Sequence, residues 1–120
     1  MMLLALPVAV FFLAMGLVAL AAPARILATF GVVVDTPEGR TEVRAVYGGF
    51  GVAVGALLIV ALGVESIRDG VFVAIAVALC GMAAGRVASA LFGERLGLWP
   101  TWAFCAIELV LAALLVLALA

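Results

Sequence analysis

Four long apolar stretches alternate with short polar segments along this chain. The apolar stretches cover about residues 2–22, 37–63, 71–92 and 100–120. Each is near or above the roughly 20 residues that a helix needs to cross a bilayer. The pattern predicts an all-α integral membrane protein, folded as one domain over residues 1–120. Because the connections are short, we expect an antiparallel up-down-up-down four-helix bundle.

The polar segments place the turns and one further short helix. The longest connection is residues 24–36, and its first part, residues 24–30, has an apolar spacing that suits a short helix at the membrane surface. Its end, Asp35-Thr36-Pro37-Glu38, supplies a capping side chain, a first-turn proline and an acid near the positive end of the helix dipole. We therefore expect the second span to begin near Pro37. Residues 64–70 and 93–99 are predicted to be compact polar turns.

The distribution of arginines suggests an orientation. In a bundle of four spans, the 24–36 connection and the 93–99 turn lie on one side, here called the mouth side. Both termini lie on the other side. The rule that basic residues stay in the cytoplasm places the mouth side there and both termini outside the inner (plasma) membrane. The mouth side carries four arginines, against Arg68 alone on the other side: Arg25, Arg40, Arg44 and Arg95. Trp99 and Trp102 suit an aromatic belt at the mouth side.

The first span raises the question of a signal peptide. Ala21-Ala22-Pro23 resembles a cleavage site, but no basic residue precedes the apolar run, and the run is long for a signal peptide. We expect the span to be retained, with cleavage as the alternative.

Composition narrows the functional classes. The chain is 70% hydrophobic and 11% charged, which no soluble domain of this size matches, and its net charge of −1 argues against a nucleic-acid partner. It has no histidine, the commonest metal ligand and proton shuttle, and its two cysteines, Cys80 and Cys105, lie within apolar runs. There is no nucleophile paired with a base and no phosphate-binding loop, so we predict neither a cofactor nor a metal, and a non-enzymatic role is favoured over a membrane enzyme.

Two ionisable residues lie inside apolar runs, and their depths match. At 1.5 Å of rise per residue, Arg86 lies roughly 9 Å below the mouth side and Glu108 roughly 12 Å below it. A lone charge in hydrocarbon costs about 2.5–3.5 kcal/mol on insertion scales, so such residues usually face a partner inside the protein. A guanidinium fits a carboxylate in a bidentate way. We therefore predict that Arg86 pairs with Glu108 across the third and fourth spans.

Other polar residues enter the same leaflet. Arg44 and Tyr47 are one turn apart on the second span, and Ser89 is one turn from Arg86 on the third. Glu42 is about 200° round the helix from Arg44 and is kept as a further candidate. The predicted polar pocket contains Arg44, Tyr47, Arg86, Ser89 and Glu108, with Glu42 as the sixth candidate.

Glycines recur beside this predicted pocket. Small residues at such spacing let membrane helices approach closely, so we expect them to pack helices within the bundle, with homodimerisation as the alternative. They are Gly48, Gly51 and Gly55 on the second span, and Gly81 and Gly85 on the third.

Three functions remain open. The first is a non-enzymatic membrane protein whose polar pocket binds a lipid headgroup or a small amphiphile, with membrane lipids as partners. The second is a structural or accessory subunit of a membrane complex, in which Arg86–Glu108 is only an interhelical staple. The third is a proton or ion pathway, which the absence of histidine and of a second deep carboxylate disfavours.

The motifs also support a family resemblance. Glu42-Val-Arg44-Ala-Val-Tyr47-Gly-Gly49 opens the second span, Gly85-Arg86-Val-Ala-Ser89 lies in the third, and Glu108 lies in the fourth. Together they resemble an uncharacterised family of small bacterial four-helix membrane proteins, described as a domain of unknown function. The resemblance covers nearly the whole chain. It implies the architecture and the site, but it implies no activity.

Overall fold

The computed structural model describes residues 1–120 and contains helices and connections without strands. Most of the sequence favours helix because leucine and alanine dominate the apolar runs. In chain order the elements are η1 (Met2–Leu4), α1 (Ala5–Ala21), α2 (Pro23–Ala28), α3 (Pro37–Val43), η2 (Arg44–Gly49), α4 (Phe50–Gly63), α5 (Glu65–Leu91), η3 (Leu98–Trp102) and α6 (Ala103–Ala118).

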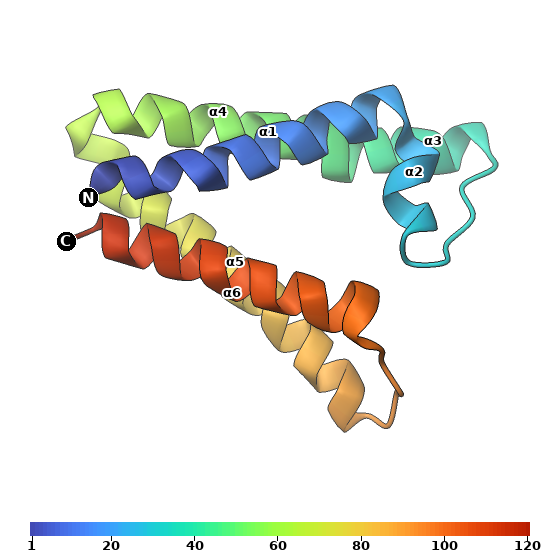
Figure 1. The fold of residues 1–120 in the computed structure, drawn as a ribbon. Helices are drawn as coiled ribbons and strands as arrows, with labels where there is room; N and C mark the ends of the chain where they lie inside the picture. Colours follow the sequence, from blue (N-terminus) through green and yellow to red (C-terminus); the bar gives the residue numbers. More distant parts are fainter.

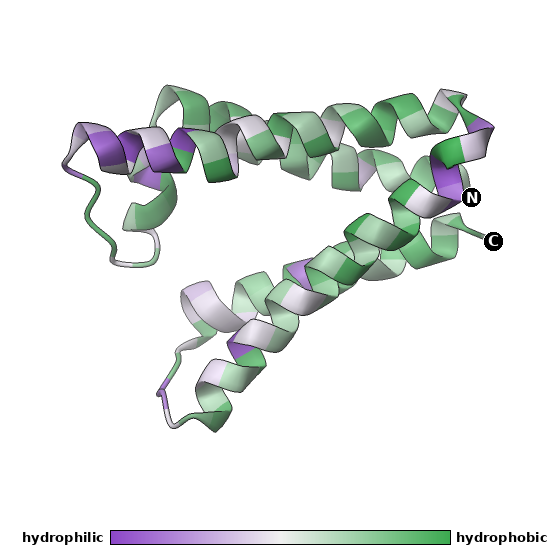
Figure 2. Cartoon of the chain, turned by 180° about the vertical axis from the view of Figure 1, so that it is seen from behind, coloured by the Kyte–Doolittle hydropathy of each residue, from purple (hydrophilic) through white to green (hydrophobic).

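Four helical segments are long and apolar enough to cross a membrane: Met2–Ala21, Pro37–Gly63, Glu65–Leu91 and Leu98–Ala118. This confirms the predicted all-α class and the four candidate spans, and it is consistent with a multi-pass membrane protein. Figure 2 shows that hydrophilic residues gather on α3 and at the junction of α4 with α5, while the long helices are mainly hydrophobic.

The predicted turn at residues 64–70 was wrong. Only Val64 leaves the helical conformation, and α5 begins at Glu65. Arg68 explains the tight junction, because its Nε–H and Nη2–H donate to the carbonyls of Ala61 and Leu62 at 3.0 and 2.8 Å. These carbonyls belong to the last turn of α4, where the helix offers them no amide partner. Arg68, near the start of α5, therefore supplies the hydrogen-bond donors that the last carbonyls of α4 lack.

The connection between α1 and α3 agrees better with the structure predicted from the sequence. The short helix α2 falls within the predicted interfacial segment, although it begins one residue earlier, at Pro23. The second span begins at Pro37, as predicted, with Thr36 as its cap. The Gly39 amide donates to Thr36 Oγ1 at 3.0 Å, which satisfies one of the free amides of the first turn.

The four long helices pack as two pairs (Figure 1). α1 lies along α4, and α5 lies along α6. The pairs meet at the end that holds both termini and diverge toward the end that holds α2 and α3. The molecule is correspondingly flat, with extents of 42 × 33 × 17 Å. The side-by-side packing of all four helices that was expected along their full length is therefore not observed.

The core lies where the pairs meet. Its largest fully buried hydrophobic side chains come from all four long helices: Phe72, Leu58, Leu79, Leu115 and Val8. Hydrophobic contact at this end holds the pairs together, and leaves the space between them open at the other end.

Glycines bring α1 and the second span into close contact. A Cβ added at Gly51 would lie 3.0 Å from Gly16 Cα, and one at Gly55 would lie 2.6 Å from the Leu13 side chain. Gly48 faces Leu20 in the same way. Gly81 and Gly85 differ from expectation, because nothing lies within 4 Å of a Cβ at either position. They make no close approach within this chain, since that face of α5 is exposed.

At Gly16 an added Cβ would meet backbone atoms, which cannot move aside as a side chain can, and this position gives the first prediction. A Cβ there would lie 2.6 Å from Val52 N and 2.8 Å from Gly48 O, so Gly16→Ala must push α1 away from the second span. We expect a loss of about 1–3 kcal/mol in the free energy of unfolding, measured by denaturant titration in micelles. The matched control is Gly81→Ala, which meets no neighbour and should be neutral or slightly stabilising. Equal stability of the two variants would contradict the close packing.

Candidate functional site

The predicted ion pair between α5 and α6 is present. Arg86 Nη2–H donates to Glu108 Oε1 at 2.7 Å, and Nε–H donates to Oε1 and Oε2 at 2.9 and 3.2 Å. Glu108 is 2% exposed, whereas the Arg86 side chain retains 21% of its surface. A buried carboxylate without hydrogen bonds is costly, so Arg86 supplies the donors that let Glu108 lie in the interior.

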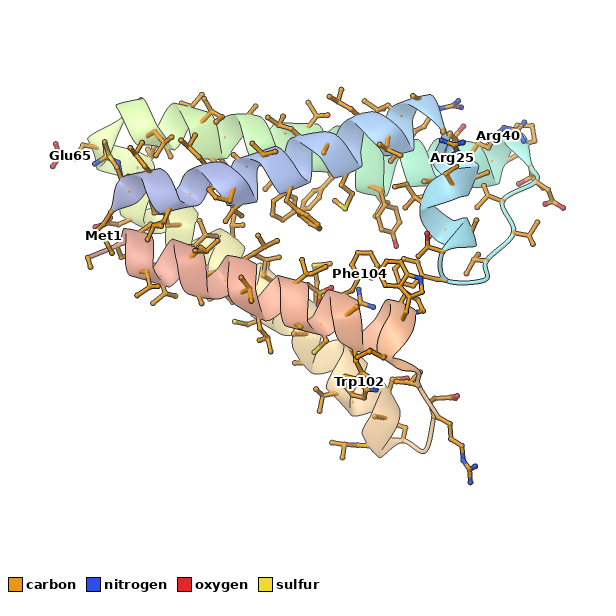
Figure 3. All side chains as sticks on the ribbon, in the orientation of Figure 1. Met1, Arg25, Arg40, Glu65, Trp102 and Phe104 are labelled. Carbon is orange, nitrogen blue, oxygen red and sulfur yellow. The ribbon has the colours of Figure 1, made fainter.

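Two aromatic rings, from different parts of the chain, lie beside the Arg86 guanidinium. Arg86 Cζ lies 5.7 Å from the ring centroids of both Phe30 and Phe104. Phe30 follows α2, so this contact crosses from the first helix pair to the second. Phe104 lies on the side of α6 that faces α1 and α2 (Figure 3). Both contacts are within the range of cation–π attraction, which strengthens when water is excluded.

Part of the guanidinium remains available. Arg86 Nη1 donates no hydrogen bond within the chain, and no buried side-chain nitrogen or oxygen lacks a partner. Nη1 is therefore accessible rather than buried. The Tyr47 hydroxyl also has no partner within the chain and is not buried without one. The site thus contains unused donors beside a carboxylate whose two oxygens both already accept hydrogen bonds.

A cavity of about 400 Å³ lies between the helix pairs and meets these groups. Its size is in the range of small-molecule sites. Its walls are mainly apolar and include four phenylalanines: Phe11, Phe12, Phe30 and Phe104. The polar lining consists of Arg25, Thr29, Tyr47, Arg86 and Glu108. An apolar chamber with a few convergent polar groups is suited to an amphiphilic molecule.

The structure does not place Arg44 in this cavity. Arg44 is exposed, and its Nε–H donates to the Leu20 carbonyl at 3.0 Å, at the end of α1. The reason is the π-helical turn η2, which runs from Arg44 to Gly49. Its wider winding breaks the one-turn spacing assumed for Arg44 and Tyr47, so the two no longer share a face. Tyr47 lines the cavity, while Arg44 caps a helix end.

Ser89 and Glu42 also lie elsewhere. Ser89 lines a shallow groove with Gly85 and Thr101, and Arg86 is shared between that groove and the cavity. Glu42 is exposed and lines a second cavity of about 320 Å³ beside residues 32–36, together with Tyr47. Of the six predicted pocket residues, the structure therefore brings together Tyr47, Arg86 and Glu108.

Sequence reasoning missed the aromatic part of the site. Phe104 lies four residues before Glu108, so the helical period alone places it on the same face of α6. Phe30 carried no such signal, because it lies in the turn after α2 and its position depends on the long connection. Trp99 extends the cluster, with its ring centroid 5.5 Å from that of Phe104.

The ion pair yields the second prediction. Glu108→Gln leaves Arg86 charged and partly buried without its counter-ion. Because Arg86 is partly open to the cavity, we expect destabilisation near the lower end of the roughly 3–5 kcal/mol that breaking a buried pair costs. The control is Glu42→Gln, the same chemical change at an exposed residue, which should stay within about 0.5 kcal/mol of the unmodified protein. Denaturant unfolding of both variants tests this, and equal stability would contradict it.

Comparison with known proteins gives one match. A family model described as "Domain of unknown function (DUF4345)" matches residues 2–119, nearly the whole chain. No curated protein and no solved structure matches this chain.

Proposed function

The chain belongs to the DUF4345 family, a family of unknown function, and on that premise we propose that it binds an amphiphilic molecule between its two helix pairs. In this proposal it is a non-enzymatic, multi-pass membrane protein. The apolar part of the ligand occupies the cavity, and its polar part lies against Arg86 and Tyr47. The proposal is drawn from the geometry of the site, because the family assigns no activity.

The observation that carries the proposal is the combination of an apolar cavity with unused donors. The cavity of about 400 Å³ is lined largely by hydrophobic side chains, yet Arg86 and Tyr47 both present unpaired N–H or O–H groups there. In an aqueous cleft, water would satisfy these groups. In a membrane, where water is scarce, the polar end of a lipid-like molecule is the natural partner.

The arrangement of the helices supports this setting. We propose that the four apolar segments cross the membrane in alternating directions, with both termini and the α4–α5 junction on one side (Figure 1). The divergent end then opens the cavity toward one leaflet. The predicted orientation, with this end in the cytoplasm and membrane lipids as partners, is part of the proposal.

Filling the cavity tests the proposed function, and this is the third prediction. Ala14 is exposed and lines the cavity, so Ala14→Phe adds a ring to the chamber without entering the packed core. Ala53→Phe makes the same change at an exposed position of α4 that does not line the cavity. We expect the unmodified protein and Ala53→Phe to retain an amphiphile through purification, near one molecule per chain. Ala14→Phe should lose it.

Mass spectrometry of extracts from purified protein measures the retained molecule. Both variants should be compared at equal stability, which denaturant unfolding establishes. Equal retention by the two variants, or no retained molecule in the unmodified protein, would count against the proposed function.

A structural role is the second candidate, and a specific observation favours it. Arg86 contacts Phe30 across the gap as well as Glu108 on α6, so it touches both helix pairs. An arginine in this position joins parts of the fold that otherwise diverge. In that case the pair is a staple in a structural or accessory subunit, and no ligand is required.

A charge swap separates the two candidates and is the fourth prediction. Arg86→Glu and Glu108→Arg should each destabilise the protein, because each places two like charges side by side. The double variant restores opposite charges, and we expect it to regain most of the lost stability, by denaturant unfolding. It moves the guanidinium from α5 to α6, away from its place between Phe30 and Phe104. The proposed function therefore predicts that the folded double variant still fails to retain the amphiphile, whereas a staple predicts no functional loss.

A further inference from the structure

The unused donors and the engaged carboxylate specify the class of amphiphile, if the proposed function holds. We propose that the occupant is uncharged and presents a hydrogen-bond acceptor, such as a carbonyl oxygen, rather than an anionic headgroup. This inference rests on the proposed function and deepens it by naming the chemistry that the site selects.

Charge balance is the first argument. The Arg86 guanidinium is neutralised at 2.7–3.2 Å by Glu108, which is itself 2% exposed. An anion that approached Arg86 would meet a pair of zero net charge, and would have to give up its hydration to enter an apolar chamber. It would also face the like charge of Glu108 at short range. A neutral molecule avoids both penalties.

Hydrogen-bond complementarity is the second argument. Arg86 Nη1 can only donate, and it lacks a partner within the chain. Both oxygens of Glu108 already accept from Arg86. The remaining polar groups of the lining are the hydroxyls of Tyr47 and Thr29, which can donate or accept. The site therefore offers a surplus of donors, and a ligand that carries an acceptor satisfies it.

Arg25 is the other cation of the lining, and it does not reverse this balance. It is exposed, in the last turn of α2. Exposed charges are screened by water and salt and contribute little. The unneutralised charge of the site therefore lies at its exposed edge, while the donors of Arg86 belong to a neutral pair.

The test uses four probes with the same alkyl chain and different head groups. They are 2-dodecanone, 1-dodecanesulfonate, dodecyltrimethylammonium and dodecane. The full chain is reconstituted in phosphatidylcholine nanodiscs, and equilibrium binding of radiolabelled 2-dodecanone is measured against empty nanodiscs and competed by the others. We expect 2-dodecanone to bind at least about tenfold more tightly than each of the others. Dodecane and dodecyltrimethylammonium accept no hydrogen bond, and a bond from a charged donor contributes about that factor. The sulfonate accepts one, but it must give up its hydration and approach the charge of Glu108.

Two substitutions connect the preference to the ion pair. Glu108→Gln removes the neutralising charge, so the preference should shift from the ketone toward the sulfonate. Arg86→Lys keeps a cation beside Glu108 but removes the free donor Nη1, so ketone binding should fall about tenfold with dodecane unchanged. Arg68→Lys is the matched control, because Arg68 also donates two hydrogen bonds but lies outside the cavity. Its binding should equal that of the unmodified protein.

The two sources of such a carbonyl are an acyl ester and a ring ketone, and further competitors separate them. Methyl dodecanoate represents the ester and 4-octylcyclohexanone the ring. Tighter competition by one of them identifies the source, and both outcomes support the proposed class.

Results that would contradict the proposed ligand class differ from results that would contradict the proposed function. If the sulfonate binds the unmodified protein as tightly as the ketone, or if dodecane does, the proposed class is wrong. If a sulfonate preference disappears in Arg25→Ala, the exposed cation selects the ligand and the inference is also overturned. If no probe binds above empty nanodiscs, the proposed function itself fails and the inference falls with it.

Discussion

The buried carboxylate of Glu108 is the constraint on which the site depends. At 2% exposure it must find donors, and Arg86 is the residue that provides them. This requirement fixes the register of α5 against α6, because a shift of one turn would separate the two groups by about 5 Å. The guanidinium held in this way also reaches Phe30 on the opposite helix pair. One ion pair thereby fixes the register of the second helix pair and supplies one contact with the first.

The cavity follows from unequal packing between the helix pairs. Glycines at positions 48, 51 and 55 let the second span lie directly against α1, so little space remains within that pair. Between the pairs, large side chains fill the terminal end, but the helices then diverge. The same apolar sequence therefore produces a packed core at one end and an open chamber at the other. The polar groups lie at the open end, where a partner could reach them.

Local chemistry explains which parts of this arrangement the sequence could predict. Helix rise alone placed Arg86 and Glu108 at matching depths, because both lie within regular helices. Regular helix geometry gave the wrong position for the Arg44 side chain, because the π-helical turn η2 changes the winding. No residue pattern predicted this π-helical turn. The prediction of a turn at residues 65–70, which was inferred from their charges, was also wrong. There, Arg68 satisfies the carbonyls of α4, and the charges continue a helix instead.

The Arg86–Glu108 ion pair raises the question of why the contact between α5 and α6 contains charged residues. α5 and α6 are joined by one short connection and pack along their apolar faces, so their association does not require ions. A buried ion pair is often no more stabilising than apolar residues of similar volume. Leucine or methionine could therefore close the same helix contact. What they could not supply is a neutral site that still presents an N–H group, with Glu108 removing the charge and Arg86 Nη1 left accessible. In the proposed function, this combination recognises a hydrogen-bond acceptor within the apolar cavity, and it would give the ion pair a role beyond joining two helices.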